Sequence, residues 1–134
     1  MMTLTLALFA NACSDDGAKR ATVAGTLTLP AASTGKPYGV RLLSKAGDPA
    51  VLPTGQMTGT TAGSAIQYSI TDVPAGSYFV LGFVDNDSSG GDSSTPGDFA
   101  GWYGHTGDGN PPGTPNAVVP AAGIVFFDFS LVAR

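Results

Sequence analysis

The sequence predicts an all-β fold in which short strands are joined by turns and loops rich in glycine, proline and aspartate. Of its 134 residues, 19 are Gly and 10 are Pro, and both types interrupt helices. All ten acidic residues are Asp, which favours turns over helix interiors. No window carries the apolar stripe of an amphipathic helix, whereas several windows alternate apolar and polar residues with the period of a strand.

Strands are expected wherever this alternation lies between turn signals. They are expected at residues 23–29, 39–45, 66–71, 77–84, 117–119 and 124–132. Segment 77–84 is apolar on both faces, which indicates a central strand. The inward residues of the last strand are expected to be Val125, Phe127, Phe129 and Leu131. Segments 30–37 and 54–64 are expected to connect strands, the second with at most one short strand of its own.

About seven short strands and no helices predict a single antiparallel two-sheet β-sandwich, because each sheet needs the other to cover its apolar face. The length fits one domain, expected over residues 21–134. The net charge of −4 argues against nucleic acid as a partner. A single Cys and a single His exclude a disulfide framework, a Cys-based zinc site and a two-histidine site within one chain.

The N-terminal residues predict an export signal. Residues 3–12 read TLTLALFANA, an apolar run shorter than the about 20 residues that span a bilayer, and they end in small residues before Cys13. With the polar stretch that follows, this arrangement resembles a bacterial lipoprotein signal. The resemblance implies cleavage of residues 1–12, acylation of Cys13 and a polar tether over residues 13–20. Ser14 after the Cys favours the outer membrane. The alternative is a buried N-terminal strand with a core cysteine.

Two segments of the predicted domain also resemble a known β-sandwich family. They are V-x-G-x-L-x-L, from Val23 to Leu29, and YSITDVPAGSY, from Tyr68 to Tyr78. Both are similar to the carboxypeptidase regulatory-like, or transthyretin-like (prealbumin-like), domain. The resemblance implies a binding, spacer or stabilising module without catalysis of its own. Val73 and Tyr78 are expected in the core.

Half of the aspartates gather after the predicted central strand, and they point to a metal. These are Asp85, Asp87, Asp92, Asp98 and Asp108. Residues 85–90 read DNDSSG, which matches the start of a calcium loop, D-x-D-x-[DNS]-G. Calcium takes six to eight oxygen ligands. The candidate ligands are Asp85, Asp87, Ser89, Gly91, Asp92 and Asp98.

The loop departs from the helix-flanked calcium motif at its end. Pro96 stands where a bidentate Glu would close the shell, so Asp98 is the natural substitute, with Asp92 as the other candidate. Clustered carboxylates repel one another, so they must be either solvated or bound to a cation. The alternative interpretation is therefore a flexible, solvated loop without metal.

An aromatic segment follows this loop. Trp102, Tyr103 and His105 could form a platform that stacks on sugar rings, which would make the protein a carbohydrate-binding module. The alternative is that Phe99 and Trp102 close one end of the sandwich. No G-x-S-x-G or comparable nucleophile motif accompanies the single His, so no catalytic residue is assigned and no enzymatic activity is expected.

These observations predict a membrane-anchored, exported, non-catalytic binding or structural module of the bacterial cell envelope, placed on the outer membrane. Calcium is the expected cofactor, held between Asp85 and Asp98. The expected partners are the membrane, through the lipid anchor, and a polysaccharide or an envelope protein. The alternative function is carbohydrate binding through Trp102 and Tyr103.

Overall fold

The computed structural model describes residues 20–48, 50–90, 95–105 and 110–134, and these form strands, turns and loops without a helix. The all-β prediction is therefore confirmed. The strands are β1 (Arg20–Leu43), β2 (Gly55–Pro74), β3 (Gly76–Val84), β4 (Phe99–Trp102), β5 (Ala117–Val119), β6 (Gly123–Phe126), β7 (Phe129–Ser130) and β8 (Val132–Ala133). Among the described residues, no helix is present that could cross a membrane.

Hydrogen bonds join the eight strands in one sheet. Its main path runs β2-β1-β3-β4-β8, with β5 paired to β3 and with β6 and β7 paired to β1. The pairs are antiparallel, except that β6 and β7 run parallel to β1. The strands of the described residues connect into one sheet rather than two separate ones, so the two-sheet sandwich is not confirmed. The central position predicted for residues 77–84 is confirmed, because β3 has β1 and β4 as neighbours.

The two longest strands pass through segments that were expected to be connections. β1 and β2 pair from Arg20 opposite Pro74 to Leu42 opposite Gly55, with register shifts between positions 28 and 37 of β1. The prediction that residues 30–37 end the first strand is wrong, as is the prediction that residues 54–64 are mainly a connection. Proline and glycine fall at the irregular positions, where a missing donor or an unusual backbone angle bends a strand without ending it.

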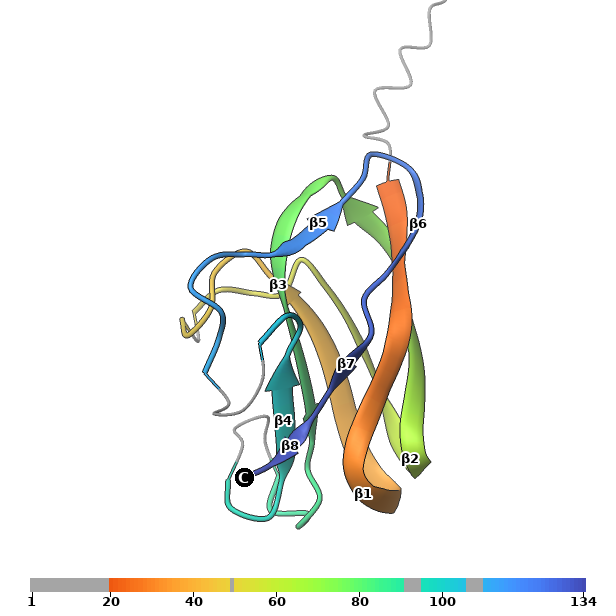
Figure 1. Ribbon diagram of the computed structural model, residues 1–134, viewed down its shortest axis with the longest axis vertical. Helices are drawn as coiled ribbons and strands as arrows, with labels where there is room; N and C mark the ends of the chain where they lie inside the picture. The colour runs from red at the N-terminus through yellow and green to blue at the C-terminus, as the bar shows by residue number, and fades with distance from the viewer. Residues whose placement is uncertain (1–19, 49, 91–94, 106–109) are drawn as a thin grey trace, which may run out of the picture.

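The paired ribbon of β1 and β2 folds back on itself at this bend (Figure 1). The backbone N–H of Ser69 donates to the sulfur of Met57 at 3.3 Å, although both residues belong to β2. A Cβ placed on Gly55 would lie 2.8 Å from the Ile70 side chain, also within β2. The two halves of one ribbon therefore face each other and enclose apolar residues between them.

The core lies between these halves and β3. Its largest fully buried side chains are Leu27, Leu42, Val23, Val40, Val73, Val80 and Val84. A Cβ placed on Gly82 of β3 would lie 3.0 Å from both Leu27 and Leu131, so β3 packs closely against the first half of β1 across the core. The core positions predicted for Val73 and Tyr78 are confirmed.

The predicted last strand is divided into β6, β7 and β8. Its expected inward pattern holds: Phe127 and Leu131 are buried, and Val125 and Phe129 pack partly buried against the core. The N–H groups of Phe127 and Leu131, which directly follow β6 and β7, donate to the Ala24 and Thr28 carbonyls of β1, and the chain then moves to β4, where β8 pairs.

Gly25 tests the packing of β1 against the C-terminal segment. A Cβ at this position would overlap the backbone carbonyl of Phe127 and lie 2.9 Å from the Tyr68 ring. We expect Gly25→Ala to lower the free energy of unfolding by about 1–3 kcal/mol, measured by urea denaturation. Gly113→Ala, whose Cβ would meet nothing within 4 Å, is the matched control and should change stability by less than about 0.5 kcal/mol. Equal stability of the two variants would contradict the packing described.

Tyr68 makes a buried hydrogen bond that links β2 to the same carbonyl. Its hydroxyl donates to the Phe127 oxygen at 2.5 Å. Burial raises the pKa of Tyr68 above its ordinary value, with smaller contributions from Asp128 and Tyr103. Stability from this group is therefore complete below about pH 10, the ordinary tyrosine pKa, and is lost as the pH rises above it. Tyr68→Phe should weaken this alkaline loss and cost about 1 kcal/mol at neutral pH; an unchanged alkaline profile would refute the assignment.

Candidate metal centre

The ends of two neighbouring strands bring two aspartates together. Val84, the last residue of β3, pairs with Phe99, the first of β4, so Asp85 and Asp98 lie next to each other at this end of the sheet. Backbone bonds hold both positions: the Asp85 N–H donates to the Pro37 carbonyl at 2.9 Å, and the Asp98 carbonyl accepts from Arg134 N–H at 2.9 Å. The site is thus built on sheet residues rather than on the loop alone.

A third carboxylate completes an acidic triad. One ligand oxygen from each of Asp85, Asp87 and Asp98 lies within 4.8 Å of the other two, an arrangement that could hold a metal ion. Asp85 and Asp98 are buried, with 6% and 3% of their surfaces exposed, whereas Asp87 is exposed. The structure brings these three predicted ligands together. Gly91 and Asp92, and also Asp108, lie outside the described residues.

Asp98 accepts hydrogen bonds from both sides of the loop. Its Oδ1 accepts from the backbone N–H of Asn86 at 3.0 Å and of Asp87 at 3.5 Å. Its Oδ2 accepts from the N–H and the hydroxyl of Thr95, at 3.0 and 2.9 Å. One buried carboxylate therefore ties the start of the loop to its end.

Asp85 and Asp87 organise the first turn. The two oxygens of Asp85 accept from the N–H groups of Ser89 and Gly90, each at 3.0 Å. Asp87 Oδ1 shares the Ser89 N–H at 2.9 Å. Ser89, a predicted ligand, donates its backbone N–H to both carboxylates, and its hydroxyl lies 3.4 Å from that of Thr95. Backbone donors offset part of the repulsion among the three charges, a means of stabilisation that the sequence did not reveal.

Hydrogen bonding also favours the ionised form of Asp87. Hydrogen bonding from Ser89, first through its side chain and then through its backbone N–H, holds the pKa of Asp87 below its ordinary value. An exposed carboxylate that stays charged to lower pH is a suitable point of entry for a cation. Each carboxylate oxygen has two lone pairs. The oxygens of Asp85 and Asp87 accept at most one of these hydrogen bonds each and so keep acceptor capacity for a hard metal ion. Asp98 already accepts two bonds on each oxygen, so a metal ion would have to replace one of its donors.

The loop rests on the bend of the ribbon. Ser33 Oγ donates to Asn86 Oδ1 at 3.0 Å and lies 3.2 Å from Thr61 Oγ1, and both Ser33 and Thr61 are buried. Lys36 Nζ donates to Ser88 Oγ at 2.8 Å, which places one positive charge beside the acidic loop. The bend therefore positions the triad through direct hydrogen bonds.

The aromatic residues predicted as a sugar platform lie in different environments. Trp102 is buried, 8% exposed, and packs edge-on against Phe79 with ring centroids 6.3 Å apart. Tyr103 is partly buried and packs against Phe127 at 4.7 Å. His105 forms an isolated bridge with Trp102 in the turn after β4. These residues do not form an open stacking surface, because the Trp102 ring is used for packing.

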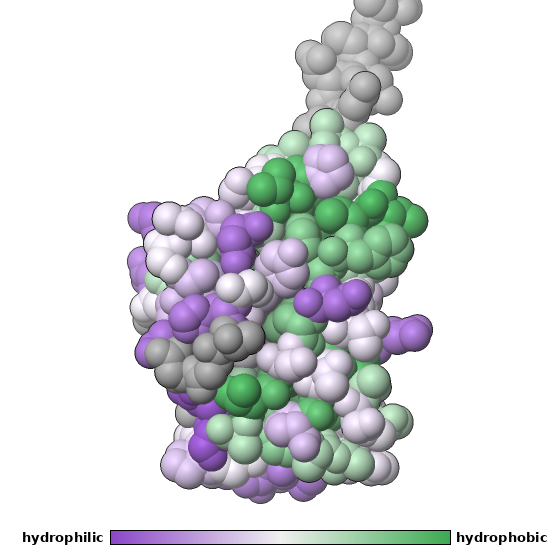
Figure 2. Space-filling model, viewed as in Figure 1, coloured by the Kyte–Doolittle hydropathy of each residue, from purple (hydrophilic) through white to green (hydrophobic). Residues whose placement is uncertain are grey.

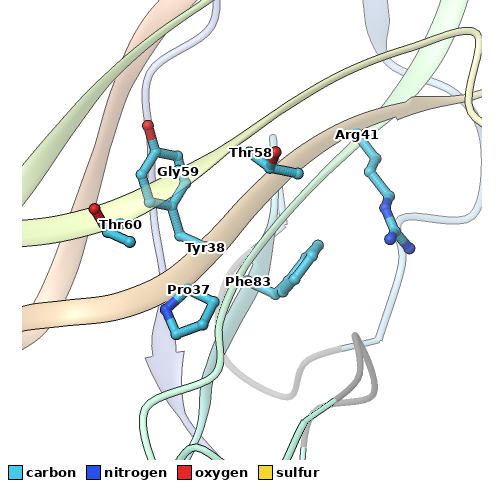
Figure 3. Close-up of a pocket in the computed structure, with 7 residues that line it drawn as sticks. All are labelled: Pro37, Tyr38, Arg41, Thr58, Gly59, Thr60 and Phe83. Carbon is cyan, nitrogen blue, oxygen red and sulfur yellow. The ribbon is translucent and has the colours of Figure 1, made fainter.

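A second feature, not singled out from the sequence, is an open depression beside the Arg41 side chain (Figure 3). Its volume is about 540 Å³, and the Arg41 guanidinium lies 5.0 Å from the centre of the Phe83 ring. It is lined by Pro37, Tyr38, Arg41, Thr58, Gly59, Thr60 and Phe83. The sequence carried one signal for this depression: alternation places the Arg41 side chain on the face of the strand that points away from the core residues Val40 and Leu42.

The chain matches no family model, no curated protein and no solved structure. The resemblances to a lipoprotein signal and to the transthyretin-like domain therefore stay predictions.

The structure predicts that Asp98 stabilises the loop even without a metal. Asp98→Asn replaces one acceptor oxygen with a donor, so either Thr95 or Asn86 loses its partner. We expect a loss of about 1.5–3 kcal/mol in the free energy of unfolding, measured in chelator by urea denaturation. Asp128→Asn is the control: its exposed Oδ1 accepts from Thr26 N–H, a bond that an amide oxygen can keep. Equal effects of the two variants would contradict a structural role for Asp98.

Proposed function

We propose that the protein is an exported, membrane-anchored, non-catalytic β-module whose loop between Asp85 and Asp98 binds one calcium ion. The observation that carries the proposal is the convergence of three carboxylates within 4.8 Å at the adjoining ends of β3 and β4. Bound calcium would neutralise the remaining repulsion and fix the loop on the bent ribbon.

Calcium suits this set of donors better than zinc or copper. The triad offers only carboxylate oxygens, which are hard ligands, and it contains neither the imidazole nor the thiolate that zinc and copper favour. The backbone donors already oppose part of the negative charge, so a modest affinity is expected, near the about 0.1–1 mM range of extracellular calcium modules. Asp87 is the exposed ligand through which the ion would enter.

The anchor is proposed from Cys13 and its neighbours, which lie outside the described residues. Its support is the apolar run before Cys13 and the short polar stretch after it, with the first strand beginning at Arg20. Placement on the outer membrane of the bacterial envelope rests on Ser14. A two-layer, transthyretin-like sandwich is the architecture we propose for the folded ribbon, supported by the approach of β3 to Leu27 across the core.

Carbohydrate binding gains no support from the geometry, because Trp102 packs against Phe79 and exposes little of its surface. No described contact favours a catalytic function either, and the non-catalytic interpretation remains part of the proposal.

The proposal is tested by thermal unfolding of the chelated chain, residues 14–134, with and without 10 mM calcium. For the wild type we expect a stabilisation of about 1.4–2.7 kcal/mol, the value that follows from the expected affinity range. Asp87→Asn should abolish this gain, because it removes the exposed ligand while sparing the buried carboxylates.

Asp48→Asn is the matched control for this test. Asp48 is also exposed, and its Oδ1 accepts a backbone N–H two residues later, as that of Asp87 does. The control should keep the full calcium response. A wild type that gains nothing from calcium, or an Asp87→Asn variant that gains as much as the wild type, would refute the metal site.

A further inference from the structure

An apolar patch lies on β5 and β6. Val118, Ile124 and Phe126 are 65%, 63% and 66% exposed, and Leu52 is the one other large apolar residue of comparable exposure among the described residues. Figure 2 shows hydrophobic residues gathered at the end of the molecule where β1 begins. We call Val118, Ile124 and Phe126 the β5–β6 patch. Soluble proteins seldom expose such residues together without a partner.

The two strands that carry the patch, β5 and β6, contain no charged side chain. Residues 117–127 read AVVPAAGIVFF, without a charged side chain. On β1, Thr22 pairs with Ile124 and Ala24 pairs with Phe126. Exposed strands at a sheet edge usually carry lysine or other charges that keep them in water. Residues 117–127 lack them, and the exposed charges that flank the patch are Asp128, two residues after Phe126, and Arg20, next to Ala21.

The patch lies where the N-terminal segment joins the fold. Ala21 pairs with Gly123, which directly precedes Ile124, and Arg20 lies opposite Pro74 at the same end of the sheet. Arg20 comes seven positions after Cys13, so a fully extended chain between them spans at most about 25 Å. An anchor at Cys13 would keep this end of the molecule close to the bilayer.

We propose that the β5–β6 patch rests on the lipid surface when the protein is anchored through Cys13. This inference rests on the anchor in the proposed function. Apolar side chains of a surface-bound segment enter the boundary between headgroups and acyl chains. Because the anchor already holds the domain at the membrane, a small patch suffices to orient it.

A second copy of the chain is the less suitable occupant. Three side chains exposed by about two thirds offer on the order of 350 Å², whereas a stable dimer buries about 800 Å² on each partner. A lipid surface needs no matching shape and can bind the patch alone.

The proposed membrane contact determines how the acidic loop is oriented relative to the bilayer. β3 runs from Gly76, whose partner is Val119 of β5, to Val84, which directly precedes Asp85. The loop therefore lies at the far end of β3 from the patch (Figure 1). Nine residues of strand place the triad about 30 Å from the membrane-facing end, directed away from the bilayer.

Depth-dependent quenching tests the contact directly. The chain from Cys13 onward contains every strand and one thiol, which can be coupled to a maleimide lipid in phosphatidylethanolamine–phosphatidylglycerol vesicles. Phe126→Trp adds a fluorophore in the patch, and Leu52→Trp adds one at a still more exposed position outside it; Trp102 contributes the same background to both. Brominated acyl chains should quench the added fluorescence at position 126 at least about twofold more, because interfacial residues lie about 5–10 Å deep.

Each outcome decides the inference. Equal quenching at positions 126 and 52 would overturn it, as would a dimer of the uncoupled chain that Phe126→Ser dissociates. Ile124→Trp replaces Phe126→Trp should the latter fail to unfold cooperatively like the wild type. Mass spectrometry of Cys13 from bacterial membranes tests the anchor separately: an unacylated Cys13 would refute the proposed anchor, whereas the chemically coupled protein reports on the patch alone.

Discussion

The bend in the β1–β2 ribbon is the constraint on which the rest of the structure depends. Because the two strands stay paired on both sides of the bend, one ribbon supplies two facing apolar surfaces, and β3 completes the core. At the bend itself, the buried Ser33 and Thr61 hydroxyls lie 3.2 Å apart, and Ser33 also donates to Asn86. The interaction that shapes the corner therefore also holds the acidic loop.

Within that loop, carboxylates hold the backbone in place by accepting its hydrogen bonds. Asp98 receives donors from Asn86 and Thr95 and so ties the two ends of the loop together. This arrangement holds residues 85–90 and 95–98, the described parts of the loop, in place before any ion binds. Calcium would then bind to ligands that are already in place. Because few groups have to be ordered on binding, less of the binding free energy is lost.

The sequence predicted what depends on local pattern. A run that is apolar on both faces located the central strand, alternation located the inward Phe127 and Leu131, and spacing singled out Asp98 as the substitute for the absent Glu. The bend could not be predicted, because Pro30 and Gly35 interrupt a strand equally well whether the chain then turns away or stays paired. The backbone N–H groups that donate to the aspartates were missed, and those of Asn86 and Asp87 reach Asp98 only because β3 and β4 lie side by side. The burial of Trp102 agrees with the alternative stated beside the sugar platform, in which this ring packs within the fold.

Calorimetric titration of calcium into the chelated chain tests the central claim most directly. The account predicts saturable binding of one ion per chain. Binding should be far weaker in Asp87→Asn at the same concentrations. The absence of binding heat at millimolar calcium, together with unchanged stability, would contradict the account and leave the three aspartates as hydrogen-bond acceptors that hold the loop.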